Sequence, residues 1–160
     1  VQAIVLLSTK PFFTDLEFRI IGDGRLFDDT VAPLRGFPNV HIERGFLTQQ
    51  EIAALHKDYG VFLSPTRMDA QGVSRDEAMA SGLVPITTDV AAIPEFVDGD
   101  SGFMAPLDDA AGLAEAIETL YHDPKRFERM SEAAAARVRR QSGPAQTTDR
   151  ELELIRKAMR

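Results

Sequence analysis

Residues 69–82 place a glycine-containing loop between an apolar strand and a short helix. The apolar run at residues 61–63 predicts the strand, Ser64-Pro65 ends it, and Gly72 and Gly82 bracket the helix. A glycine lets a ligand approach the backbone closely. The start of a helix offers free N–H groups and partial positive charge, so a phosphate can bind there without a basic side chain. The segment therefore predicts an α/β unit that can bind an anion.

Two carboxylates flank the predicted phosphate position. Asp69 precedes the loop and Glu77 lies in the first turns of the helix, with seven residues between them. Carboxylates accept hydrogen bonds from hydroxyls, so a sugar on one side of a diphosphate and a ribose on the other would suit them. Local explanations also stay open. Asp69 could bond its own turn, and Ser74 with Glu77 matches a capping box, in which Glu77 would only cap its own helix.

This segment resembles the E-x7-E region of the retaining glycosyltransferases of family 4. Asp69 and Glu77 are followed by Ala-Met-Ala-Ser-Gly at residues 78–82. Asp69 stands where Glu is usual in that family, and Gln71 stands where an aromatic residue is common. Further motifs follow the family order, namely Gly22-Asp23-Gly24, Asn39-Val40, Gly45-Phe46, Ile93-Pro94-Glu95 and Val97-Asp98-Gly99.

The resemblance carries implications for the site. In the family the first acid contacts the donor sugar and the second contacts the nucleotide ribose, which implies Asp69 and Glu77 as the catalytic pair. The resemblance and the loop pattern together predict a donor-binding set of Asp69, Ala70, Gln71, Gly72, Val73, Ser74, Glu77 and Gly22. Gly22 also fits a simple turn at the end of a strand. The family needs neither a metal nor a cofactor, and its substrate is a nucleotide-diphosphate sugar.

Strand and helix patterns alternate along the whole chain. Residues 16–21, 40–42, 61–63, 84–88 and 102–105 predict strands, with helical patterns between them. Such alternation predicts right-handed crossovers and a parallel sheet covered by helices on both faces, with ligands at the carboxyl ends of the strands. The fold class is therefore α/β, a three-layer Rossmann-like domain with a parallel sheet. The resemblance identifies it with the C-terminal half of a GT-B glycosyltransferase.

One domain accounts for all 160 residues. Residues 1–7 are apolar without a capping residue, so we expect them to be the tail of a helix cut from a longer protein, with the domain truncated at its N-terminus. The resemblance then implies that the N-terminal acceptor domain is absent. It also implies that the last helix crosses back to that domain.

Composition argues against several classes of protein. The net charge of −7 disfavours nucleic-acid binding, and the lack of cysteine rules out disulfides and thiolate metal sites. No apolar run reaches the roughly 18 residues of a transmembrane segment, and no signal peptide is recognisable, so we expect a cytoplasmic protein. His41, His56 and His122 lack the spacing of a zinc site and are expected at the surface. Residues 97–102 predict a turn rather than a metal-binding D-x-D motif.

The sequence therefore predicts the donor-binding domain of a retaining glycosyltransferase. The full enzyme would transfer a sugar from a nucleotide-diphosphate sugar to a saccharide, lipid or protein acceptor, which the absent N-terminal domain would mainly bind. The isolated chain is expected to be inactive. Two alternatives stay open: a nucleotide-sugar epimerase of the same fold, and a non-catalytic nucleotide-sugar-binding module.

Overall fold

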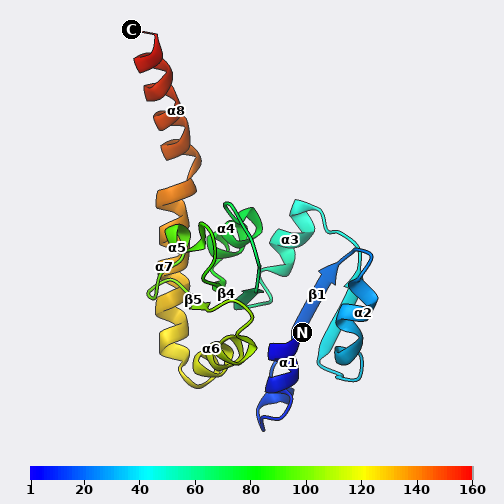
Figure 1. The fold of residues 1–160 in the computed structure, drawn as a ribbon. Helices are drawn as coiled ribbons and strands as arrows, with labels where there is room; N and C mark the ends of the chain where they lie inside the picture. The colour runs from blue at the N-terminus through cyan, green and yellow to red at the C-terminus, as the bar shows by residue number, and fades with distance from the viewer. Residues whose placement is uncertain (160) are drawn as a thin grey trace.

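The computed structural model describes residues 1–159, in which strands alternate with helices as the sequence predicts (Figure 1). The strands are β1 (Phe18–Gly22), β2 (Val40–Arg44), β3 (Val61–Ser64), β4 (Val84–Thr88) and β5 (Phe103–Ala105). The α-helices are α1 (Gln2–Leu7), α2 (Phe27–Val31), α3 (Gln49–Leu55), α4 (Val73–Ala80), α5 (Ile93–Phe96), α6 (Ala110–His122), α7 (Pro124–Ser142) and α8 (Pro144–Ala158). Two short 3-10 segments are η1 (Phe13–Asp15) and η2 (Ala32–Leu34).

Local sequence signals explain several helix starts. At α3 the predicted capping box forms: the Thr48 Oγ1 accepts the Glu51 N–H at 3.3 Å, and the Glu51 carboxylate accepts the Thr48 N–H at 2.8 Å. Asp109 caps α6, and Asp123 caps α7 ahead of Pro124, whose ring nitrogen has no N–H to satisfy. These helix starts therefore follow from short-range hydrogen bonding.

The strands pair in parallel, as the sequence predicts, and they form two sheets rather than one continuous sheet. β1 pairs with β2, and β3, β4 and β5 form the second sheet in that order. Phe18 lies opposite Val40 in the first sheet, and Val61 lies opposite Val84 in the second. Within residues 1–159, β1 and β3 are not paired. The sequence does not reveal this division, because an apolar pattern reports how deeply a strand is buried, whereas edge pairing depends on residues far apart in the chain.

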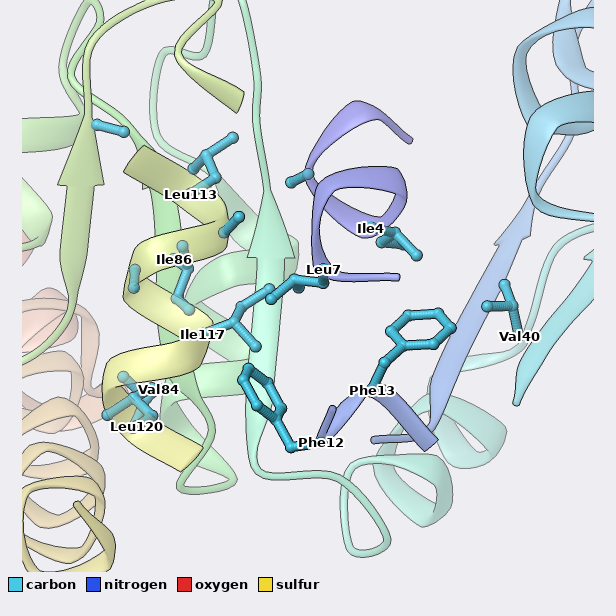
Figure 2. Close-up of a cluster of buried hydrophobic side chains, with 14 of the residues drawn as sticks. Ile4, Leu7, Phe12, Phe13, Val40, Val84, Ile86, Leu113, Ile117 and Leu120 are labelled. Atoms are coloured by element: carbon cyan, nitrogen blue, oxygen red, sulfur yellow. The ribbon is translucent and has the colours of Figure 1, made fainter. Parts of the chain in front are cut away.

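One hydrophobic cluster joins the two sheets (Figure 2). Phe12 stacks on Tyr121 of α6 with 4.4 Å between ring centroids. The next residue, Phe13, contacts Phe18 of β1 at 5.9 Å and Phe37 at 5.2 Å between centroids. Each buried aromatic side chain removes a large apolar area from water. The segment between α1 and β1 is therefore an apolar bridge between the two halves of the fold.

β4 lies at the centre of the second half. All of its five residues are buried, and α4, α6 and α7 all contact it. This burial explains its run of apolar and β-branched residues, which is typical of an interior strand in a parallel sheet covered on both faces. The loop after β3 therefore leaves a half-buried strand that is paired with this buried strand.

α8 extends away from the rest of the fold (Figure 1). Residues 142–144 separate it from α7, as the sequence predicts, because Gly143 adopts an extended conformation and a proline follows. Its apolar residues Leu152 and Ile155 are exposed, and so is Met159, which directly follows it. Among residues 1–159, no helix combines the length and the apolar character that crossing a membrane requires.

Candidate functional site

α4 begins directly after the glycine loop. Gly72 is its amino-terminal cap and adopts a left-handed conformation with φ 77° and ψ 57°. No side chain within residues 1–159 caps this helix, so its first N–H groups are left to water or to a ligand. Ser74 and Glu77 do not form the capping box that their spacing allows. The interpretation that Glu77 only caps α4 is therefore wrong.

Glycine is required at position 72 by its backbone and by its surroundings. A side chain is disfavoured at φ 77°, and an added Cβ would lie 2.8 Å from Nη1 of Arg75. A left-handed residue followed by the right-handed turn at Val73 gathers consecutive N–H groups into a concave anion-binding shape. The loop geometry is therefore suited to an anion.

Asp69 is half-buried and bonds its own turn. Its Oδ1 accepts the N–H of Gln71 at 3.2 Å, which confirms the local explanation of this residue. The bond engages only one carboxylate oxygen, so Oδ2 can still accept a hydrogen bond from a hydroxyl. A contact between Asp69 and a donor sugar stays a prediction.

One pocket of about 340 Å³ lies between α4 and the α7–α8 junction, and its lining includes Gln71, Val73 and Glu77. The remaining lining residues are Asp76 and Ala80 from α4, with Val138, Arg139, Ser142, Gly143 and Pro144 from the junction. Apolar walls with a few polar groups are typical of small-ligand sites. The structure therefore brings part of the predicted donor-binding set together.

Other members of the predicted set lie outside this pocket. Gly22 ends β1 in the other sheet, and the adjacent Asp23 Oδ1 accepts the Gly24 N–H at 2.7 Å, which is the turn that the sequence allows. Ala70 and Ser74 are exposed near the loop but do not line the pocket. A second pocket of about 310 Å³ between β5 and α6 contains none of the predicted residues.

The prediction that all three histidines lie at the surface is wrong for His56. This residue is 8% exposed, and its Nδ1 lies 3.2 Å from the Ser81 Oγ at the end of α4. Burial lowers the pKa of His56, and the nearby charge of Glu77 partly opposes that shift. Ile52, Leu55 and His56 share one helical face, and this spacing is the signal that could have revealed its burial.

Residues 97–102 form the predicted turn. The Oδ1 of Asp98 accepts from the Ser101 Oγ at 2.7 Å, from the Ser101 N–H at 3.0 Å and from the Asp100 N–H at 3.2 Å, while Oδ2 pairs with Arg137. The Ser101 hydroxyl bond contributes most to lowering the pKa of Asp98. Among residues 1–159, no three His, Asp or Glu side chains gather as a possible metal-ligand set.

Sequence reasoning missed a buried ion pair under the glycine loop. Arg75 is 2% exposed, and its Nη2 lies 2.7 Å from Oδ1 of Asp76. Ser142 Oγ donates to Oδ2 of Asp76 at 3.3 Å, which links α4 to the end of α7. Charged residues of this kind usually lie on solvated faces. No pattern in the sequence marks these two as buried.

Comparison with known families decides what kind of protein carries this loop. The family described as glycosyl transferases group 1 matches residues 1–123, which include both sheets, the glycine loop and all of α6. The chain belongs to the group 1 glycosyltransferases. Its pair of acids, Asp69 and Glu77, lies within the matched residues.

Two curated proteins illustrate how far this group 1 glycosyltransferase resembles its relatives. It is 26% identical over 148 residues to a sulfoquinovosyl transferase of Arabidopsis thaliana, covering 90% of this chain and 29% of that protein. It is 30% identical over 142 residues to the N-acetyl-alpha-D-glucosaminyl L-malate synthase of Bacillus anthracis, covering 86% of this chain and 36% of that protein. The chain therefore spans about a third of the length of these relatives.

Similarity to a solved structure shows the fold of this group 1 glycosyltransferase chain. HepE of Anabaena, solved in complex with UDP, superposes with a TM-score of 0.79 at 17% identity, covering 98% of this chain and 44% of that one. Together with the parallel sheets and flanking helices, this likeness shows the Rossmann-like fold of the GT-B glycosyltransferases.

Proposed function

We propose that this chain binds a nucleotide-diphosphate sugar and is the donor-binding part of a retaining glycosyltransferase. The diphosphate lies against the backbone N–H groups of the Gly72 loop. Glu77 accepts hydrogen bonds from the ribose, and Asp69 accepts one from the donor sugar through Oδ2. The acceptor is held mainly by polypeptide beyond this chain, which spans only about a third of its curated relatives.

The observation that carries the proposal is the uncapped start of α4 behind a left-handed glycine. These N–H groups have no side-chain partner among the described residues, so an anion would satisfy donors that otherwise need water. Membership of the group 1 glycosyltransferases supports the diphosphate of a sugar nucleotide as that anion. The UDP in the HepE complex supports the same class of ligand.

The proposed chemistry places the fixed donors where charge develops. Breaking the bond between the anomeric carbon and the diphosphate leaves growing negative charge on the diphosphate oxygen. N–H groups already aimed at that oxygen stabilise the transition state more than the ground state. Glu77 and Asp69 hold the two ends of the donor, which keeps the anomeric carbon aligned with the acceptor.

We further propose that the donor is bound without a metal. Carboxylates that hold a divalent ion need free oxygens. Asp98, the acid that begins the D-x-D-like run, instead has both oxygens engaged by Ser101, Asp100 and Arg137. Adding EDTA during a binding titration should therefore leave the affinity for the donor unchanged.

A thermal-shift panel of nucleotide sugars tests donor binding. A ligand that binds only the folded chain raises its melting temperature, by about 3 °C at tenfold excess over the dissociation constant. We expect one nucleotide class to give this shift, and its nucleoside alone to give less. A panel without any shift would contradict the proposal.

The role of Glu77 is tested in the full-length transferase. We expect Glu77→Ala to lower kcat/KM for transfer at least a hundredfold, equivalent to about 2.7 kcal/mol of transition-state binding. Glu128→Ala, at an exposed position on α7, is the matched control and should retain wild-type turnover.

The same assay distinguishes the two alternative functions. Release of an isomerised donor without any acceptor would favour the epimerase. Donor binding without any reaction of the full-length protein would favour the non-catalytic module.

A further inference from the structure

The guanidinium of Arg75 lies buried directly beneath the glycine loop. Its Cζ lies 4.8 Å from the centroid of the Phe96 ring on α5. Its Nε and Nη2 both bond Oδ1 of Asp76, at 3.2 and 2.7 Å. Burying an arginine costs free energy unless the charge is paired and hydrogen-bonded. The contacts of this side chain with Phe96 and Asp76 therefore offset the cost of burying it.

Arg75 holds the peptide between Gln71 and Gly72 in one direction. Its Nη2 donates to the carbonyl oxygen of Gln71, four residues earlier. The peptide bonds of the described residues are all trans, and the carbonyl and N–H of a trans peptide point in opposite directions. Because the Gln71 carbonyl points toward the guanidinium, the Gly72 N–H points away from it.

One nitrogen of the Arg75 guanidinium has no hydrogen-bond partner in the part of the chain that the structure describes. Nη1 is buried and unpaired among residues 1–159, and it lies close under Gly72, where an added Cβ would be 2.8 Å away. A positive charge with a spare donor therefore lies immediately behind the N–H groups that begin α4. Because the guanidinium is buried, water screens its attraction for an anion at the loop less than that of a surface arginine, while the paired Asp76 carboxylate offsets part of it.

Asp76 and Ser142 keep this guanidinium in place. Oδ1 of Asp76 holds two of its donors, while Oδ2 accepts the hydroxyl of Ser142 at 3.3 Å. Ser142 is the last residue of α7, directly before the break that precedes α8. The glycine loop is thus connected through three side chains to the α7–α8 junction.

We propose that Arg75 is a positioning residue for the diphosphate. It holds the Gln71 carbonyl inward so that the Gly72 N–H faces the phosphate, and its buried charge adds to the attraction. This inference rests on the proposed function, because it takes the donor diphosphate as the anion. Asp76 and Ser142 hold Arg75 in place, and both also line the pocket beside the loop.

Isothermal titration of the full chain with UDP, with inorganic pyrophosphate and with uridine tests this role. Arg75→Gln removes the charge and the fork of donors, and we expect it to weaken UDP and pyrophosphate binding about tenfold. Affinity for uridine, which lacks the diphosphate, should be unchanged. Arg75→Lys keeps a charge but not the planar fork, so its loss should be smaller.

Arg126→Gln is the matched control. Arg126 stacks on Phe103 with Cζ 4.7 Å from the ring centroid, away from the loop, so its removal should leave all three affinities at the wild-type value. An Arg75→Gln chain that binds UDP and pyrophosphate as tightly as the wild type overturns the positioning role and leaves the proposed function standing. A wild-type chain that binds no UDP and no nucleotide sugar overturns both.

A milder variant covers the case in which Arg75→Gln does not fold. Ser142→Ala keeps Arg75 and removes only the hydroxyl that holds Asp76. We expect pyrophosphate binding about twofold weaker and a shifted amide resonance of Gly72 in an otherwise native spectrum. Wild-type affinity and an unmoved Gly72 resonance in both Ser142→Ala and Arg75→Lys would contradict the proposal.

Discussion

The two sheets differ in how completely they are buried. Every residue of β4 is buried, and helices α4, α6 and α7 surround it. In β1 no residue is fully buried, and in β2 only Val40 is. The glycine loop and the pocket belong to the firmly packed half, which also supplies the α7–α8 junction. The proposed phosphate loop thus follows β3, a half-buried strand that pairs with the fully buried β4.

The largest expected loss of stability comes from a substitution in the half that contains β4. Ile86 on β4 is 0% exposed, so we expect Ile86→Ala to lower the free energy of unfolding by about 3 to 4 kcal/mol, from lost burial and the cavity left behind. Ile20→Ala on β1, where the side chain is only half-buried, should cost about 1 kcal/mol. Urea unfolding followed by circular dichroism measures both. Equal losses would remove the contrast between the sheets.

A smaller effect is expected at the loop itself. Gly72→Ala places a Cβ at φ 77° and against the Arg75 guanidinium, and we expect it to cost about 1 to 2 kcal/mol of unfolding free energy. Gly36→Ala in the β1–β2 half is the matched control, because nothing lies within 4 Å of its added Cβ and its φ is unstrained. The same urea titration compares them. A Gly72→Ala chain as stable as Gly36→Ala would show that the loop relaxes freely.

The smallest expected effect is on the pH dependence of stability, and it concerns two histidines, one in each half of the fold. Burial lowers the pKa of His56, so the unfolded chain binds its proton more readily, and the free energy of unfolding should fall as pH drops below about 6.5. Above that pH the residue contributes no slope. His56→Asn should flatten the dependence in urea titrations between pH 7.5 and 5.5. His41→Asn, at an exposed position on β2, should leave it in place, and the opposite ranking would contradict this account.

Much of the fold could be predicted because its signals are local. The capping box of Thr48 with Glu51, the Asp123-Pro124 start of α7 and the break at residues 142–144 each depend on residues within one turn of each other. The start of α4 at Gly72 is of the same kind. Such signals survive in the structure because their hydrogen bonds form within the element that they define.

The remaining features depend on contacts between distant residues. The separation of β1 from β3 is a matter of edge pairing, which periodicity does not report. Burial of Arg75 requires Phe96 and Asp76 around it, and Asp76 in turn contacts Ser142, 66 residues further along the chain. For the candidate site, the sequence therefore predicted that a glycine loop begins α4 but not the buried ion pair beneath that loop.

The most direct test of the central claim is an amide-resolved NMR titration of the chain with UDP. If backbone donors at the start of α4 hold the diphosphate, the amides of Gly72, Val73 and Ser74 should shift most with UDP and little with uridine. Largest shifts at the pocket between β5 and α6, with the Gly72 loop unmoved, would contradict the account.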